Sequence, residues 1–316
     1  MSIGCRLCGN SNLISVLDLG ASPPCESFLS EEQLDEPEVT YPLHLRLCPD
    51  CLLLQIPALI TPEETFGSDY AYYSSCSTSW VEHARRFVDQ AVESLGLGPG
   101  SFVVEAAAND GYLLQHVMNR GIRCLGIEPS LNCSEAARAK GIPVLRAFLD
   151  ETLAARVRDE HGPADLVVAN NVFAHIPDIT GFASGLRGLV ADTGRVSIEV
   201  HHALSLITAA QFDTVYHEHF QYWTVLAARR GIAAGGLRLV DVELLPTHGG
   251  SIRLWAVPGE SDVAEHPRVA EIEAVERAAG LDGPEGYLGL AKRAAGIRDD
   301  LVAFLIEARR AGRRVV

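Results

Sequence analysis

The stretch from Ser101 to Leu114 constrains the fold more than any other part of this sequence. Apolar residues dominate positions 102–106 and predict a strand that is buried on both faces. A tight polar turn follows at 109–111, and Tyr112 opens a helix. Doubly wound α/β domains use this order of strand, glycine turn and helix N-terminus to bind a nucleotide-like ligand. We therefore expect such a site at the carboxyl end of this strand.

A second strand, expected at 124–127, ends in the carboxylate of Glu128. A carboxylate at this place can accept hydrogen bonds from ribose hydroxyls. The first turn lacks the triple-glycine spacing of pyrophosphate sites and carries the acidic Asp110, which would repel an anion but not a cationic sulfonium. The two turns thus predict a site for S-adenosylmethionine, with an ordinary βαβ crossover as the alternative.

The middle of the chain continues the alternation of strands and helices. Further strands are expected near 143–146, 165–171, 195–200 and 237–245, and helices over 78–95, 131–140 and 178–190. This alternation predicts an α/β fold with a doubly wound, Rossmann-like parallel sheet. His175 and Glu199 follow or end two of the strands and should lie beside the cofactor crevice. From about residue 264 the chain is expected to be helical, with a long amphipathic helix over 284–311.

Two Cys-x-x-Cys pairs, Cys5 with Cys8 and Cys48 with Cys51, predict a metal centre. Four thiolates on two tight turns complete the tetrahedral shell of a structural zinc ion. Residues 40–47 alternate between apolar and polar, as a half-buried strand does. We expect a small β-rich lobe that ends near residue 60 and whose core is too small without the metal. The other cysteines are expected to be buried apolar residues: Cys25, Cys76, Cys124 and Cys133.

The densest group of chemically active side chains is Tyr216-His217-Glu218-His219. Its histidines are two positions apart, whereas a zinc-binding helix needs histidines four positions apart. We therefore predict a loop that is suited to proton transfer. His217 is expected to have a structural role only. The loop at 66–75 carries tyrosines and serines that could bind a sugar or phosphate, or could pack between lobes. His248-Gly249-Gly250 with Arg253 could bind a phosphate, carry a proton or form a plain β-hairpin.

Composition excludes several classes of function. The 316 residues suffice for about two domains. A formal net charge of −15 argues against a nucleic-acid partner, which needs clustered lysine and arginine. The sequence has no apolar run that could span a bilayer and no signal-peptide pattern, so we expect no membrane partner and a cytoplasmic protein with reduced cysteines. We also expect a monomer.

Several motifs occur in order and together resemble those of the S-adenosylmethionine-dependent sugar C-methyltransferases of antibiotic deoxysugar pathways. They are the paired cysteines, Tyr70-Ala71-Tyr72-Tyr73-Ser74-Ser75, Asn109-Asp110-Gly111-Tyr112-Leu113-Leu114, Tyr216-His217-Glu218-His219-Phe220 and His248-Gly249-Gly250. The resemblance spans essentially the whole chain. It implies a class I methyltransferase fold behind an N-terminal zinc lobe. It also implies methylation at C3 of a nucleotide-linked 4-keto-2,6-dideoxyhexose, usually a dTDP sugar.

The resemblance further implies roles for individual residues. His219 would remove the C3 proton, Glu218 and Tyr216 would orient nearby groups, and His175 or a tyrosine would stabilise the enolate oxygen. The catalytic set is Tyr70, His175, Tyr216, Glu218 and His219. The expected cofactor-binding set is Glu105, Ala107, Asn109, Asp110, Gly111, Tyr112, Leu113, Glu128, Pro129, Phe148 and Asn171. The expected substrate-binding set is Tyr72, Ser74, Ser75, His248 and Arg253.

The sequence departs from the family pattern at three places. Ala107 stands where the first turn usually has glycine, and its methyl group could narrow the methionine pocket. His201-His202 stand where a Pro-Tyr pair is common. The chain stops at Val316, where the family continues into a further α/β domain, so a truncated gene or a fragment is expected.

The domain organisation and the activity can be stated as expectations. We expect a zinc lobe at 1–66, a methyltransferase domain at 67–258 and a helical segment at 259–316. Two alternatives to a C-methyltransferase remain open. One is an O- or N-methyltransferase on the same scaffold, which needs no base for a C–H proton. The other is a non-catalytic, zinc-lobed binding protein.

Overall fold

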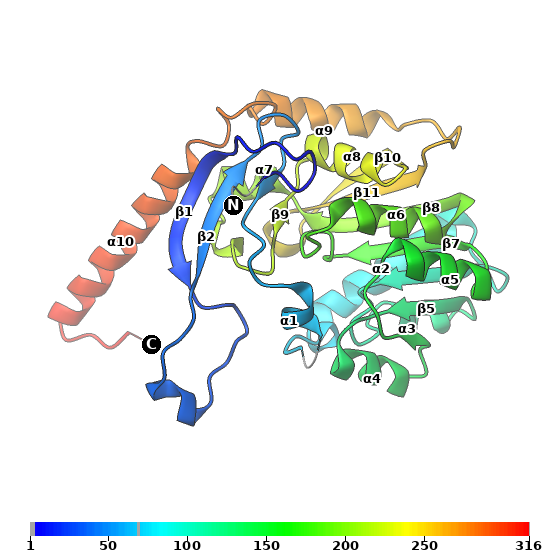
Figure 1. Ribbon diagram of the computed structural model, residues 1–316, viewed down its shortest axis with the longest axis horizontal. Coiled ribbons are helices and arrows are strands. Elements are labelled where there is room, and N and C mark those ends of the chain that lie inside the picture. The colour runs from blue at the N-terminus through cyan, green and yellow to red at the C-terminus, as the bar shows by residue number, and fades with distance from the viewer. Residues whose placement is uncertain (1–3, 68–69, 316) are drawn as a thin grey trace.

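A seven-stranded sheet forms the centre of the molecule (Figure 1). The computed structural model describes residues 4–67 and 70–315. In spatial order the strands are β10 (Leu237–Leu245), β11 (Ser251–Pro258), β8 (Val190–His201), β7 (Ala164–Asn170), β4 (Phe102–Ala106), β5 (Arg123–Ile127) and β6 (Val144–Leu145). Of these, β11 runs antiparallel to both of its neighbours, and the other pairings are parallel.

The order of the strands places the ligand crevice. From β4 the chain proceeds to β5 and β6 on one side, and then crosses to β7 and β8 on the other. In open α/β sheets, ligands bind outside the carboxyl ends of the strands at the point where the order reverses. Here that point is the carboxyl end of β4, which is also where the sequence predicts the site.

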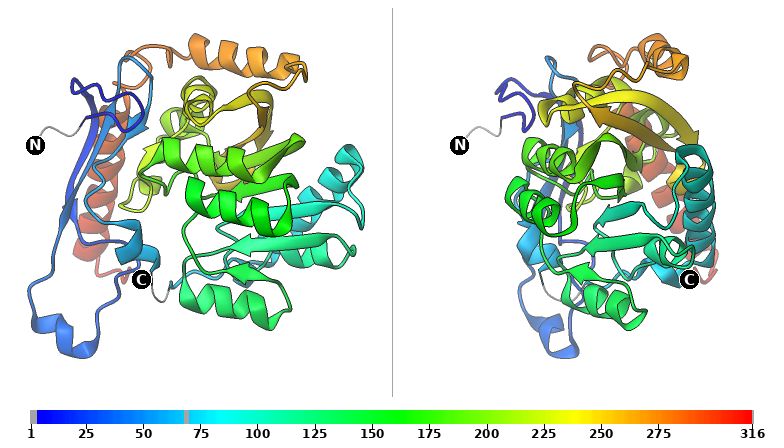
Figure 2. Two further views of the ribbon diagram at one scale, coloured as in Figure 1. Left: turned by 45° about the vertical axis from the view of Figure 1, so that its right-hand side comes forward. Right: turned by 90° about the vertical axis from the view of Figure 1, so that its right-hand side faces the viewer.

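Helices cover both faces of this sheet (Figure 2). On one face lie α2 (Thr78–Leu95), α3 (Leu114–Met118) and α4 (Leu131–Ala139), which share a buried apolar cluster with the strands. On the other face lie α5 (Glu151–His161), α6 (Ile179–Leu189) and α8 (Val225–Ala234), which share a second cluster. The predicted doubly wound α/β fold is therefore confirmed.

A second sheet of four strands carries the N-terminal lobe. Its strands are β1 (Ile14–Ser22), β2 (Tyr41–Leu47), β3 (Leu54–Gln55) and β9 (Gln221–Tyr222). The last strand comes from much later in the chain and pairs antiparallel with β3. Side chains of α7 (Ala203–Ala209) and of α10 (Leu290–Arg310), which lies along β1 (Figure 1), belong to the same buried cluster as those of this sheet. The sheet of this lobe therefore includes a strand from outside residues 1–66.

The remaining elements are η1 (Glu31–Asp35), α1 (Pro62–Phe66), η2 (Ser74–Cys76), η3 (Phe212–Thr214), η4 (Thr247–Gly249) and α9 (Pro267–Ala278). The bounds predicted for α2 and β10 are confirmed, whereas the helix expected over 284–311 begins only at Leu290. The residues before it form tight turns. Glycine is needed in them at position 286, because a Cβ atom there would lie only 2.5 Å from the Ala279 carbonyl oxygen.

Two of the four cysteines outside the Cys-x-x-Cys pairs are buried as expected. Cys124 and Cys133 are buried, but Cys76 is exposed and Cys25 is partly exposed because both lie outside the strands and α-helices that form the core. None of the described helices is both long and apolar enough to cross a membrane.

Candidate active site

A cavity of about 380 Å³ opens at the carboxyl ends of the central strands. Most of the residues predicted to form the site lie in its wall. From the cofactor set these are Ala107, Asn109, Tyr112, Glu128, Pro129, Phe148 and Asn171; from the catalytic set, Tyr70, His175, Tyr216 and His219; and from the substrate set, Tyr72, Ser74 and His248. The structure therefore brings the turn after β4 and the segment around His219 to one shared cavity.

The cofactor end of the cavity is built on the turn after β4. Ala107 and Asn109 hold the left-handed backbone conformation, with φ of +58° and +48°, which glycine adopts most easily. The Asn109 N–H donates to one carboxylate oxygen of Glu128 at 2.9 Å, and the Ser130 N–H donates to the other at 2.8 Å. These bonds hold the Glu128 carboxylate at the cavity wall, where its remaining lone pairs can accept from hydroxyls.

The residues at this end fit S-adenosylmethionine. The buried Oδ1 of Asn171 has no hydrogen-bond partner among the described residues, and Asn171 lies in the cavity wall. A buried acceptor without a partner is costly unless a ligand or water satisfies it. The methyl group of Ala107 forms part of the wall and leaves the cavity open. The cavity is thus open with Ala107 at the position where the family pattern has glycine.

Some residues of the predicted cofactor set are packed inside the protein and do not reach the cavity. Glu105 and Leu113 are completely buried within β4 and in the core beside it. Gly111 has φ of +79°, and a Cβ atom there would lie 2.3 Å from Cδ1 of Ile142. Gly111 is thus required for packing, and none of these three residues lines the cavity.

Asp110 and Ser75 are bonded to each other rather than to the cavity. The Asp110 carboxylate accepts hydrogen bonds from the hydroxyl and the N–H of Ser75, and Nζ of Lys140 lies 3.2 Å from the same carboxylate. Because Lys140 offsets the charge of Asp110, and Asp110 lies outside the cavity wall, this charge does not act on the cofactor directly. Ser75 is likewise not a direct substrate ligand here.

The loop that contains Tyr70 closes over the cofactor turn. Asn132 accepts from the Tyr70 N–H at 3.0 Å and donates to the Tyr70 carbonyl at 2.8 Å. The Ser74 N–H donates to Oδ1 of Asn109 at 2.9 Å, and the Asn109 amide donates to the Tyr72 carbonyl at 3.1 Å. The loop and the turn are therefore tied together. Ser68 and Asp69, also part of the predicted loop, lie outside the described residues.

His219 is fixed through both ring nitrogens. Its Nδ1 lies 3.0 Å from the Thr214 carbonyl oxygen, which can only accept, so Nδ1 carries a proton. Its Nε2 then has a free electron pair and accepts from the Tyr216 hydroxyl at 2.9 Å. Burial, with the nearby imidazoles, holds the pKa of His219 well below its usual value. The ring is therefore neutral and can accept a proton.

Glu218 lies behind Tyr70. Its carboxylate accepts from the Tyr70 hydroxyl at 3.2 Å, and Nδ1 of His175 lies 3.9 Å away. Burial raises the pKa of Glu218 to about 7, so its protonation changes within the neutral pH range. Tyr70 lines the cavity and Glu218 does not. The charge of Glu218 therefore acts on the cavity through the direction in which the Tyr70 hydroxyl points.

Sequence reasoning missed several residues of the wall. His201, at the end of β8, lies in the wall, where the sequence places the end of its strand, but it is in none of the predicted sets of site residues. Trp80 stacks on Tyr112 at a centroid distance of 5.9 Å and meets His248 edge-on at 4.8 Å. Glu26 reaches the wall from the loop between β1 and β2. No local pattern marks Trp80 or Glu26, because each reaches the cavity only through the packing of distant segments.

Arg253 does not lie in the cavity wall. Its guanidinium pairs with the Glu199 carboxylate and lies 4.3 Å above the Phe87 ring, and both charged side chains are buried. Glu199 also contacts Nε2 of His83 at 2.8 Å and accepts from the Thr247 hydroxyl at 3.0 Å. The expectation that Arg253 binds a substrate phosphate does not hold, because its charge is already used inside the protein.

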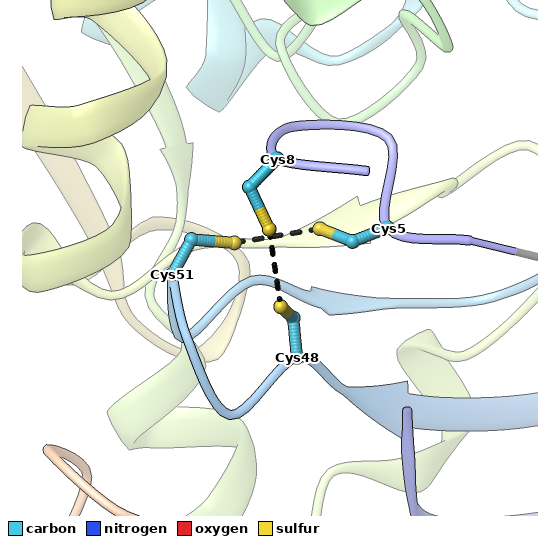
Figure 3. A group of neighbouring side chains, drawn as sticks. All are labelled: Cys5, Cys8, Cys48 and Cys51. Carbon is cyan, nitrogen blue, oxygen red and sulfur yellow. Dashed lines mark hydrogen bonds between the residues drawn. The ribbon is translucent and has the colours of Figure 1, made fainter. Parts of the chain in front are cut away.

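The four predicted metal ligands meet in the N-terminal lobe (Figure 3). The sulfur atoms of Cys5, Cys8, Cys48 and Cys51 all lie within 4.8 Å of one another, and the Cys5–Cys51 and Cys8–Cys48 pairs are 3.4 Å apart. Tetrahedral zinc with bonds of about 2.3 Å to sulfur needs sulfur–sulfur distances of about 3.8 Å. The cluster therefore fits a structural zinc ion with no open coordination position.

Three family models match consecutive parts of the chain. Residues 5–66 match a family model for a zinc binding domain, residues 80–242 one for a methyltransferase domain, and residues 246–316 one for a C-methyltransferase C-terminal domain. The chain is 34% identical over 283 residues to C-methyltransferase NovU of Streptomyces niveus, an alignment that covers 90% of this chain and 67% of the relative.

Solved structures show more distant likeness. Magnesium protoporphyrin IX methyltransferase ChlM from Synechocystis PCC 6803, with bound SAH, is 18% identical with a TM-score of 0.45, and the match covers 56% of this chain and 83% of that chain. An S-adenosylmethionine-dependent methyltransferase from Clostridium acetobutylicum is 12% identical with a TM-score of 0.46, covering 57% and 92%.

The family models and the curated relative decide among the alternatives that the sequence leaves open. They support neither an O- or N-methyltransferase nor a non-catalytic binding protein. The methyl donor is S-adenosylmethionine, and the four clustered cysteines bind zinc. The chain therefore belongs to the family of zinc-binding, S-adenosylmethionine-dependent C-methyltransferases.

Proposed function

We propose that this enzyme methylates C3 of a nucleotide-linked 4-keto-deoxyhexose, a dTDP sugar, in a deoxysugar pathway of antibiotic biosynthesis. The observation that supports this most is the cavity shared by the cofactor turn, the basic nitrogen of His219 and the Tyr70 hydroxyl. A C–H bond beside a ketone can be broken by a side-chain base if the enolate oxygen is stabilised. The cavity offers both kinds of group.

His219 is the proposed base. The Tyr216 hydroxyl rotates away from Nε2, which then accepts the C3 proton, and the phenol oxygen accepts a hydrogen bond from the new N–H. The Thr214 carbonyl keeps the ring oriented and stabilises the positive charge that forms. When bound, S-adenosylmethionine supplies an electrophilic methyl group on a positively charged sulfur. The cavity then contributes by holding the enolate carbon in line with that methyl.

Tyr70 is the proposed donor to the enolate oxygen at C4. A protonated Glu218 can donate to the Tyr70 oxygen, which frees the phenolic proton to point into the cavity. Burial raises the pKa of Tyr70, so the phenol remains a donor at neutral pH. His175, which also lines the cavity, is a second candidate, with a pKa that burial lowers to about 4.

The cavity wall suits an uncharged sugar. None of the described residues in the wall is lysine or arginine. A diphosphate placed inside would find no cation to offset its desolvation. We therefore propose that the sugar enters the cavity and the nucleotide diphosphate stays outside it. We further propose that the enzyme acts as a cytoplasmic monomer.

The test is incubation with S-adenosylmethionine and a panel of dTDP-4-ketohexoses, reading the mass gain and the position of the new methyl by NMR. We expect a C3-methyl product, and C3 hydrogen–deuterium exchange in heavy water. His219→Asn should lose both methylation and exchange while binding S-adenosylmethionine normally by calorimetry. A methyl group on oxygen or nitrogen, or an unimpaired His219→Asn enzyme, would contradict the proposal.

A further inference from the structure

Four imidazole rings line one side of the cavity in a row. His175 and His219 have ring centroids 4.7 Å apart, His219 and His201 are 5.2 Å apart, and His201 and His248 are 5.2 Å apart. All four residues belong to the cavity wall. Solvent exposure increases along the last three: His219 is 4% exposed, His201 is half-buried and His248 is exposed. The row therefore connects the proposed base to the surface.

The reaction proposed above requires such a connection, and this inference rests on that proposed function. The acceptor loses a C–H bond, whose electron pair stays on carbon as the enolate, and the proton forms an N–H bond on His219. The enolate carbon then bonds to the methyl carbon, whose bond to sulfur breaks and leaves its electron pair on sulfur. The cationic donor becomes neutral, so one proton must leave the enzyme in every turnover.

His219 cannot pass this proton to bulk water by itself. It is buried, its Nδ1–H is held by the Thr214 carbonyl, and its Nε2 faces the Tyr216 hydroxyl and the cavity. Burial holds the pKa of Tyr216 above its usual value, so the phenol keeps its own proton and cannot take up a second one. The proton has to move to another wall residue.

We propose that His201 and His248 form the exit route that carries the acceptor's proton from His219 to solvent. In each transfer an N–H bond breaks, its electron pair stays on the donor nitrogen, and an N–H bond forms on the next ring. The ring centroids are 5.2 Å apart at both steps, and one water molecule in the cavity can bridge each pair of rings. A proton on one ring disfavours a second proton on its neighbour, so the row carries one at a time.

The charges around the row favour outward movement. His219 is surrounded by the other imidazoles, and burial with those neighbours lowers its pKa well below the usual value. His201 is half-buried and faces His248. Its desolvation and that neighbour lower its pKa to about 4, although the carboxylates of Glu199 and Asp213 partly offset the effect. His248 faces Glu199 and His83, and it reaches solvent. Each step outward thus brings the proton closer to carboxylate charge or to water.

His201 is the informative position for a test. It is the ring between the base and the surface. It is also the first residue of the His201-His202 pair, which stands where a Pro-Tyr pair is common in the family pattern. His202, the next residue, points elsewhere, because its ring lies 2.7 Å from the buried Glu276 carboxylate and outside the cavity wall. The exit route is therefore a property of this chain's own residue.

The experiment compares His201→Phe with a matched control, His161→Phe, on the end of α5 and outside the cavity. The probe acceptor is the dTDP-4-ketohexose that the wild-type enzyme methylates best. We expect kcat of His201→Phe to fall about 100-fold, with little change in KM. This is the lower end of the range of rate losses caused by removing a group that transfers a proton. Added imidazole buffer should restore much of that kcat and should not change the control. His201→Gln, which keeps a polar side chain, should show the same loss and the same rescue.

Three results would overturn the proposal. An unchanged kcat in both His201 variants would show that the proton leaves by another route. A raised KM with no imidazole rescue would make His201 a substrate-binding residue. If the wild-type enzyme methylates no member of the acceptor panel, the proposed function fails and the exit route fails with it, whereas the first two results refute the route alone. Circular dichroism and Tm of each variant confirm that the fold is intact.

Discussion

Replacement of Arg253 by methionine should destabilise the fold rather than weaken acceptor binding. The Arg253 side chain is 2% exposed and that of its partner Glu199 is 0% exposed. Methionine preserves an apolar contact with Phe87 but leaves the buried carboxylate without its arginine. Breaking a buried ion pair on one side costs about 3–5 kcal/mol. At about 2 °C per kcal/mol for a chain of this size, Tm should fall by about 6–10 °C.

The penalty should decrease in acid. Burial raises the pKa of Glu199, but His83 and Arg253 outweigh it and hold the pKa below its usual value. A carboxyl group whose pKa is lower in the folded protein than in the unfolded chain stabilises the fold at pH values above its unfolded pKa. This stabilisation is lost as the pH falls through the folded pKa. Without Arg253 the carboxyl, which keeps only His83 and Thr247 as partners, takes up a proton at higher pH, and this removes the charge that Arg253 no longer offsets. The Tm difference between variant and wild type should therefore narrow as the pH falls from neutral toward the ordinary carboxyl pKa.

The assay is thermal unfolding followed by dye fluorescence, with zinc and S-adenosylmethionine held constant. Arg298→Met is the matched control, because Arg298 is 69% exposed and pairs with the exposed Asp299. Its Tm should change by less than about 2 °C. A wild-type Tm for Arg253→Met together with a raised KM for the acceptor would refute this reasoning and favour a phosphate-binding role.

Three further predictions follow from the structure. Cys48→Ser should lose bound zinc, as measured by metal analysis. It should also lose methyl transfer, because β3 of the zinc lobe pairs with β9, the strand that follows the proposed base. Full activity in a zinc-free variant would contradict this. Burial raises the pKa of Glu218 to about 7, and the protonated form frees the Tyr70 hydroxyl, so kcat/KM should fall as the pH rises through about 7. Glu218→Gln should remove this fall from the pH profile. If the fall is unchanged in the variant, it belongs to another group. Gly111→Ala should lower the free energy of unfolding, measured in urea, by about 2–4 kcal/mol, because of the left-handed φ and the clash with Ile142. An unchanged free energy of unfolding would show that the turn can relax.

Local patterns in the sequence predict the framework of this protein. Apolar runs mark β4 and β10, and the helical period marks α2 with its observed bounds, because each pattern depends on neighbours within a few residues. The two Cys-x-x-Cys pairs predict the metal cluster, because the chemistry of four thiolates allows few other interpretations. The ends of β4 and β5 predict where the cofactor residues gather, because parallel strands end at one edge of the sheet.

Pairings between distant segments are what the sequence does not predict. Asp110 looks like a cofactor residue until Lys140, 30 positions later, is seen to neutralise it. Arg253 looks like a phosphate ligand until Glu199, 54 positions earlier, is seen to hold it. Both ion pairs arise from packing, which a one-dimensional pattern does not contain. The same limit explains why Trp80 and Glu26 in the cavity wall have no signal in the sequence.

The pairing of β9 with β3 determines how such enzymes can exchange parts. The Ile56 N–H donates to the Phe220 carbonyl at 3.0 Å, and Arg6 near the metal donates to the same carbonyl. A chimera that takes only residues 1–66 from a relative would therefore present a foreign edge to the segment that carries His219. A working graft has to transplant residues 212–223 together with the lobe, so inheritance of the two should be linked even though about 150 residues separate them in the gene.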